Sequence, residues 1–177
     1  MPRTPASRAA SQPRAYLTVI VEHAGWEKAI TDPVPPLRRA AKAALAVARR
    51  DRRGPKARSV GIAVALIDDR AMRKLNRVYR GKDKSTNVLS FPAPEAQARG
   101  PSAGRQALGD VAIALGTLER EARAQGKPLA DHLAHLMVHA VLHLLGYDHE
   151  SEAEAEHMES LERRALAGLG IADPYRR

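Results

Sequence analysis

Continuous apolar runs, several of them rich in β-branched residues, recur along the first two thirds of the chain. Such runs, bounded by turn residues, are typical of β-strands. The first run, YLTVIV, is predicted to be a buried strand. Four strands follow from this pattern, at Tyr16–Val21, Val60–Ile67, Thr86–Phe91 and Leu108–Leu115.

Segments with helical periodicity and capping residues lie between and after these runs. Prolines, acidic caps and glycines mark their ends, as expected for helix boundaries. The last helix begins with a capping box formed by Ser151 and Glu154. Five helices are predicted: Leu37–Arg50, Arg70–Tyr79, Thr117–Gln125, a histidine-bearing helix opened by Pro128, and one from Ser151 to about Leu166.

The order of these elements predicts an α+β fold, an α/β sandwich of one mixed four-stranded sheet packed with about five helices. The pattern leaves the strand order open. Residues 15–177 are expected to form a single domain. Residues 1–14 are expected to be a disordered basic leader, and the segment Ala93–Gln106, rich in Pro, Gly and Ala, a flexible loop.

The charge of the chain favours a polyanionic partner. The net charge is +9, and only 3% of the residues are aromatic, which argues against a surface that stacks bases on rings. Residues 1–60 hold 13 Lys and Arg against 4 Asp and Glu, whereas residues 128–177 hold 4 against 9. The basic surface and the acidic C-terminal part are therefore separate in sequence. The absence of Cys and of a long apolar run favours a cytoplasmic protein.

The stretch HLMVHAVLHLLGYDHE carries the candidate chemistry. On a helix, His139 and His143 are four residues apart and project from one face. Gly146 can adopt the left-handed conformation that turns the chain, so that His149 returns toward the same point. Three protein ligands with a fourth position open are typical of a catalytic zinc site, whereas structural sites have four ligands and usually include Cys.

Other histidines compete for this interpretation. His132 and His135 fall on the same stripe, and His135 with His139 is an alternative pair of ligands. Only His139 and His143 lie beside the turn, so His135 is expected to support a ligand without binding the metal, or to pack in the interior. His157 is expected at the surface. Ala140 occupies the position where an H-E-x-x-H metalloprotease has its general base, which argues against peptide hydrolysis.

Three blocks of the sequence resemble one known family. The run HAVLHLLGYDH at His139–His149 resembles the signature of the YbeY family of rRNA-maturation endoribonucleases, and Asn76–Pro92 and Leu108–Ile113 resemble two further blocks. The resemblance implies a single-strand-specific, metal-dependent endoribonuclease that matures the 3′ end of 16S rRNA and takes part in ribosome quality control. It implies RNA of the small ribosomal subunit as partner, with possible ribosomal proteins or GTPases.

The resemblance also assigns residues. The metal ligands become His139, His143 and His149, with zinc the expected ion, although nickel or another transition metal also accepts imidazoles. The functional Arg becomes Arg80, whose guanidinium suits a phosphate; its alternative is an ordinary surface ion pair with Asp83. Three basic neighbours of Arg80 are candidate substrate-binding residues: Arg77, Lys82 and Lys84.

Two other functions stay open at this point. One is a ribosome-associated assembly factor whose metal is structural, and the other is a metallohydrolase that acts on another substrate. Metal content and RNA cleavage, measured together, separate these three possibilities.

Overall fold

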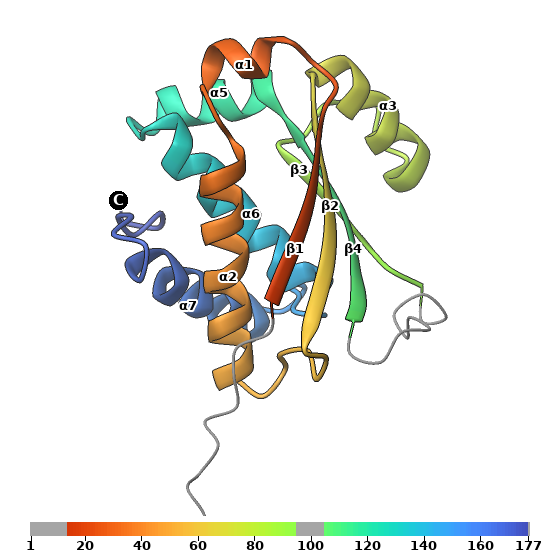
Figure 1. Ribbon diagram of the computed structural model, residues 1–177. Coiled ribbons are helices and arrows are strands. Elements are labelled where there is room, and N and C mark those ends of the chain that lie inside the picture. Colours follow the sequence, from red (N-terminus) through yellow and green to blue (C-terminus); the bar gives the residue numbers. More distant parts are fainter. Residues whose placement is uncertain (1–13, 95–104, 177) are drawn as a thin grey trace, which may run out of the picture.

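A mixed four-stranded sheet forms the centre of the protein (Figure 1). The computed structural model describes residues 14–94 and 105–176. The strand order is β1-β2-β4-β3, with β1 parallel to β2, β2 parallel to β4, and β3 antiparallel to β4. The strands are β1 (Arg14–Val21), β2 (Ser59–Ile67), β3 (Val88–Pro92) and β4 (Arg105–Ala114). The predicted mixed sheet is thus confirmed, and the strand order is added.

The first strand is not buried as the sequence predicted. β1 lies at the edge of the sheet, and its side chains alternate between the covered and the open face. Tyr16 and Ile20 are 45% and 51% exposed, although they belong to a continuous apolar run. The run looked fully buried because it is continuous and rich in β-branched residues, and neither property reveals which face other elements cover.

Six helices are found in the described part of the chain, against about five predicted. They are α1 (Gly25–Ala29), α2 (Val34–Arg50), α3 (Asp69–Arg80), α5 (Leu115–Ala124), α6 (Leu129–Leu144) and α7 (Glu152–Ala167). The additional helix is α1, a single short turn that buries Trp26 completely. The Trp26 indole N–H donates to the carbonyl of Ile67 at 3.0 Å, which fastens this turn to the end of β2.

The helix ends follow the predicted caps. The Asp68 carboxylate accepts a hydrogen bond from the Ala71 amide at 2.7 Å at the start of α3. Gly81 ends this helix in the left-handed conformation, with φ of 68°. The capping box of Ser151 and Glu154 begins α7 with both of its hydrogen bonds formed. Local sequence therefore determines where α3 and α7 begin.

The helices divide between the two faces of the sheet (Figure 1). α2, α6 and α7 pack on one face, where Val64, Leu66 and Ile113 join their apolar side chains in the larger core. α3 packs on the other face in a smaller core that contains Met72 and Leu89. The two faces thus differ in how completely they are covered.

Some predictions concern residues outside the described ranges. Residues 1–13 of the predicted leader and residues 95–104 of the predicted loop are among them. Among the described residues, no helix combines the length and the apolar character needed to cross a bilayer.

Candidate metal centre and the adjoining cleft

Three histidines converge at the C-terminal end of α6. His139 and His143 lie one helical turn apart, and their Nε2 atoms are 3.1 Å from each other. The helix ends at Leu144, and Gly146, with φ of 84°, turns the chain so that His149 returns beside them. One ring nitrogen from each of the three histidines lies within 4.8 Å of the others. The structure therefore brings together the three histidines that the sequence singled out.

The donor set fits a divalent transition-metal ion. Two imidazole nitrogens bound to tetrahedral zinc at about 2.0–2.1 Å lie roughly 3.3 Å apart, close to the distance between His139 and His143. All three donors are imidazoles, which suit zinc, nickel, copper and iron. Three protein ligands leave one tetrahedral position for water or substrate. The arrangement fits an open metal site, and the identity of the ion is not fixed by it.

A buried carboxylate supports the first histidine. Glu162 of α7 is 1% exposed, and its Oε1 lies 2.7 Å from His139 Nδ1. Its Oε2 lies 3.0 Å from His135 Nε2 and also accepts a hydrogen bond from the Tyr175 hydroxyl. The contact at Nδ1 fixes the His139 ring and directs Nε2 toward the other two histidines, as carboxylates do beside metal-bound histidines.

Sequence reasoning missed Glu162. Its signal is its place in α7, where Met158, Leu161 and Ala165 form the buried stripe and Glu162 occupies a position of the same stripe. An acidic residue among buried apolar positions needs a partner. The partner includes His135, so the expectation that His135 supports the site agrees with this contact.

The protonation of this cluster follows from its burial and its hydrogen bonds. Burial raises the pKa of the Glu162 carboxyl, but the hydrogen bonds from His135 and His139 outweigh it and hold the pKa at about 2. Burial lowers the pKa of His143 to about 4, and the neighbouring His139 and His149 add to the shift. At neutral pH His143 is therefore neutral, which is the form that binds a metal ion.

A polar cleft with a volume of about 570 Å³ borders His139, one of the three converging histidines. Asn87, Glu121 and His132 also form part of its lining. The Asn87 amide donates to both oxygens of Glu121, at 3.2 and 3.0 Å, and His132 Nε2 lies 2.8 Å from Glu121 Oε2. Burial lowers the pKa of His132 despite this carboxylate. Sequence reasoning did not identify Glu121.

The predicted basic residues lie at the end of α3 and in the loop that follows it. Arg80 and Arg77 are exposed in the last turn of α3, and Lys82 and Lys84 are exposed in the loop that follows. Arg80 does not pair with Asp83, because Arg73 donates two hydrogen bonds of 2.9 and 2.7 Å to that carboxylate. Within the described residues, Arg80 forms no hydrogen bond or ion pair.

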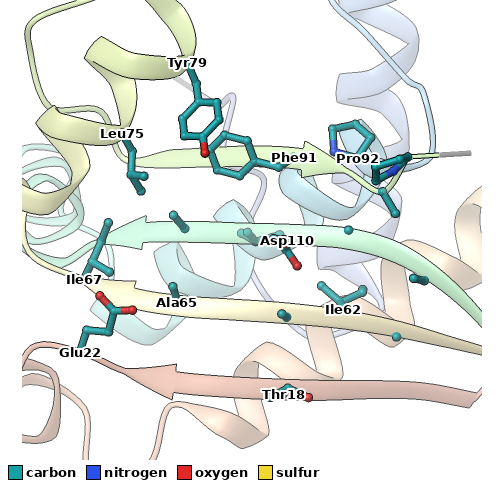
Figure 2. Close-up of a pocket in the computed structure, with 18 of the residues that line it drawn as sticks. Thr18, Glu22, Ile62, Ala65, Ile67, Leu75, Tyr79, Phe91, Pro92 and Asp110 are labelled. Atoms are coloured by element: carbon teal, nitrogen blue, oxygen red, sulfur yellow. The ribbon is translucent and has the colours of Figure 1, made fainter. Parts of the chain in front are cut away.

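A second hollow lies on the α3 face of the sheet. This groove of about 980 Å³ has small residues such as Ala65 on its floor (Figure 2). Tyr79 and Phe91 meet edge to face along one side, with ring centroids 4.9 Å apart, and Asp110 projects from β4. The groove is distinct from the polar cleft, since α3 and α6 pack on opposite faces of the sheet.

The remaining histidine behaves as expected. His157 lies at the surface, and its Nε2 is 3.0 Å from Asp51. Tyr147 donates its hydroxyl to the same carboxylate at 2.7 Å. Asp148 accepts a hydrogen bond from the His149 backbone amide at 2.8 Å and so stabilises the turn.

The chain is similar to several known proteins and to one family model. The sequence model of one family, described as Endoribonuclease YbeY, matches residues 27–170. An Endoribonuclease YbeY of Rhodopseudomonas palustris (strain BisB5) is 58% identical over 118 residues, which are 64% of this chain and 60% of that protein. One from Parvibaculum lavamentivorans is 48% identical over 164 residues, 90% of this chain and 84% of that protein. A solution structure from Thermotoga maritima matches with 22% identity and a TM-score of 0.49, over 92% of this chain and 100% of that one.

Proposed function

The chain belongs to the YbeY family, and we propose that it is a metal-dependent endoribonuclease acting on single-stranded RNA. We assign it, more finely, to the maturation of the 3′ end of 16S rRNA and to ribosome quality control, with the small ribosomal subunit as partner and the cytoplasm as its location. The observation that carries the proposal is the convergence of three imidazole nitrogens within 4.8 Å, with one of the rings held by a buried carboxylate.

Cleaving a phosphodiester requires an activated nucleophile and neutralisation of the charge on the phosphate oxygens. Bound at the three histidines, zinc supplies a Lewis acid and lowers the pKa of a water molecule to about 7. The protein's own part is to keep His143 neutral and to hold the three imidazoles correctly oriented and close together. Burial of His143 serves the first need, and the Glu162 contact to His139 serves the second.

The basic residues that follow from the family resemblance complete the proposal. Arg80 orients the phosphate and offsets transition-state charge through its planar guanidinium. Arg77, Lys82 and Lys84 follow the RNA backbone, because phosphate contacts position a strand without reading its sequence. What supports this assignment is that all four side chains are exposed and that Arg73, not Arg80, occupies Asp83.

Metal content and RNA cleavage, measured on the same samples, test the proposal. We expect about one zinc per wild-type chain and cleavage of a single-stranded 16S rRNA 3′-end fragment. The variant His143→Ala should lose both. His157→Ala is the matched control, since it removes an exposed imidazole outside the cluster and should keep both. Metal retained by a wild-type protein that cuts no RNA would favour the assembly-factor function instead.

A further inference from the structure

We propose that the polar cleft beside the three histidines is a subsite for one ribonucleotide, in which Glu121 accepts a hydrogen bond from the ribose 2′-hydroxyl. The inference rests on the proposed function, because it takes RNA as the substrate. It adds a binding site and a residue that reads the sugar.

The place and size of the cleft suit a nucleotide next to the reacting phosphate. His139 belongs both to the metal centre and to the cleft lining, so a group bound in the cleft lies beside the metal centre. The volume of about 570 Å³ falls within the range of roughly 300–1,000 Å³ that is typical of small-molecule sites. The cleft is therefore large enough for one nucleotide, and the shared His139 places that nucleotide next to the metal centre.

Glu121 is held in place, and its carboxylate is still accessible. Asn87 and His132 contact its oxygens at 2.8 to 3.2 Å, which fixes the carboxylate against the wall of the cleft. The side chain is 32% exposed, so part of it faces the cleft. An ionised carboxylate accepts hydrogen bonds and donates none. Its ligand must therefore offer a donor.

The chemistry of a nucleic acid limits what that donor is. A carboxylate repels phosphate oxygens, so Glu121 is unsuited to the backbone itself. The ribose 2′-hydroxyl is a donor carried on the sugar, close to the phosphate, and it distinguishes RNA from DNA. A base N–H is the competing donor, but it remains in a 2′-deoxy nucleotide, whereas the 2′-hydroxyl is lost.

Two cations on the rim provide for the adjacent phosphate. Lys127 donates one of its three ammonium hydrogens to the Pro174 carbonyl at 2.9 Å, which leaves two hydrogens and brings the C-terminal segment to the cleft. Arg176, also in the lining, is exposed. The cleft thus combines an acceptor for a hydroxyl with cations for a phosphate, as a ribonucleotide requires.

Binding measurements with single-atom changes in the RNA test the subsite. The protein is the full chain carrying His143→Ala, so that no cleavage occurs, and fluorescence anisotropy gives the Kd of a single-stranded RNA. The same RNA is made with one 2′-deoxy nucleotide at each position in turn. We expect one position at which the 2′-deoxy change weakens binding about tenfold, the size of a hydrogen bond to a charged group.

Variants of Glu121 must then remove that tenfold difference. The difference should vanish in Glu121→Ala. It should fall to about threefold in Glu121→Gln, whose side chain keeps more of the contacts to Asn87 and His132. Glu119→Ala, two residues away on α5 and outside the cleft lining, should keep it. Thermal unfolding verifies that each variant is folded. A loss of affinity that is equal for RNA and all deoxy-substituted strands would mean that Glu121 does not read the sugar.

Two further results keep the subsite and the proposed function apart. Arg176→Ala should lower the slope of log Kd against log salt by about 0.7, the value for one phosphate contact on a single strand; an unchanged slope removes the phosphate contact from the proposal. A wild-type protein that cuts RNA but shows no position-dependent 2′-deoxy effect contradicts the subsite alone. A position-dependent effect without any cleavage contradicts the proposed function alone.

Discussion

The two faces of the sheet differ in how far their charged groups are buried. On the face covered by α2, α6 and α7, the charged Glu162 is 1% exposed and is bonded to two histidines and a tyrosine. On the α3 face, Arg73 and Asp83 pair across the surface with more than half of each side chain exposed. Both carboxylates accept short hydrogen bonds, yet only Glu162 is enclosed.

The difference matters because the strength of an electrostatic contact depends on its surroundings. Solvent and salt weaken a surface pair, whereas a buried carboxylate that loses its partners keeps its full desolvation cost. Glu162 on the α6 face is therefore expected to hold His139 firmly, whereas the Arg73–Asp83 pair on the α3 face is expected to add little to stability.

Removing the buried carboxylate should have the largest effect. Glu162→Ala leaves His135, His139 and Tyr175 without their shared acceptor. A buried polar group without a partner costs about 1–3 kcal/mol, so we expect the free energy of unfolding to fall by about 3 kcal/mol. Urea denaturation of the metal-free proteins measures it. The matched change on the other face, Asp83→Ala, should leave the midpoint unchanged, because its partner Arg73 is exposed to water.

Similar urea midpoints for Glu162→Ala and Asp83→Ala would contradict this difference between the two faces. Glu162→Gln sharpens it, since the amide oxygen can still accept from one histidine. Its loss of stability should therefore fall between those of the wild type and Glu162→Ala. The variant should also bind zinc more weakly than wild type, by about 10–100-fold, because His139 loses its orienting contact.

The same carboxylate should make stability depend on pH. The pKa of Glu162 is about 2 in the folded protein, against an ordinary value of 4.5, so the unfolded chain binds the proton more tightly. The stabilisation is present above pH 4.5 and is lost as the pH falls through that value toward about 2. The shift corresponds to roughly 3 kcal/mol. Acid unfolding followed by circular dichroism should show this loss in the wild type, while Glu162→Gln should lack it.

Sequence reasoning succeeded where the cause of structure is local. The Asp68 cap, the Gly81 and Gly146 turns and the Ser151 capping box each act within a few residues, and the structure contains all of them. The convergence of His139, His143 and His149 is also local, because a helix and one turn span it. The helix-bearing fold and the three-histidine cluster could therefore be predicted.

What could not be predicted depends on long-range packing. Glu162 lies 23 residues from His139 and meets it only because α7 packs on α6. Glu121 lies 34 residues from Asn87. β1 was assigned to the interior because its residues are apolar, but the sheet order places it at an edge. Each of these three features depends on which elements become neighbours, and the periodicity of the sequence does not predict that.

Arg80 provides a smaller test, on the exposed face. Arg80→Ala should lower the rate of RNA cleavage by about 30-fold, equivalent to roughly 2 kcal/mol for one charge-assisted contact. Its thermal midpoint should not change, because the side chain has no hydrogen bond within the described residues. Arg80→Lys should recover only part of the rate, since an ammonium lacks the planar fork. The control is Arg70→Ala, an exposed arginine in the first turn of the same helix.

If Arg80→Ala cuts RNA as fast as Arg70→Ala, the assignment that the family resemblance gave to Arg80 is wrong for this chain. A slower rate together with a lower midpoint would instead mean that Arg80 supports the fold. The two faces would then differ less in their contribution to stability, because a side chain on the α3 face would also stabilise the fold.

The smallest effects are expected from the basic loop after α3. Lys82→Ala and Lys84→Ala should each weaken RNA binding only a few-fold and lower the salt slope by about 0.7, whatever the RNA sequence. Asn76 keeps this loop in place by donating to the Lys84 carbonyl at 2.8 Å, so neither substitution removes the contact that holds the backbone. Lys56→Ala, in the loop before β2, is the control. A salt slope that stays constant in both variants would show that RNA does not follow this surface.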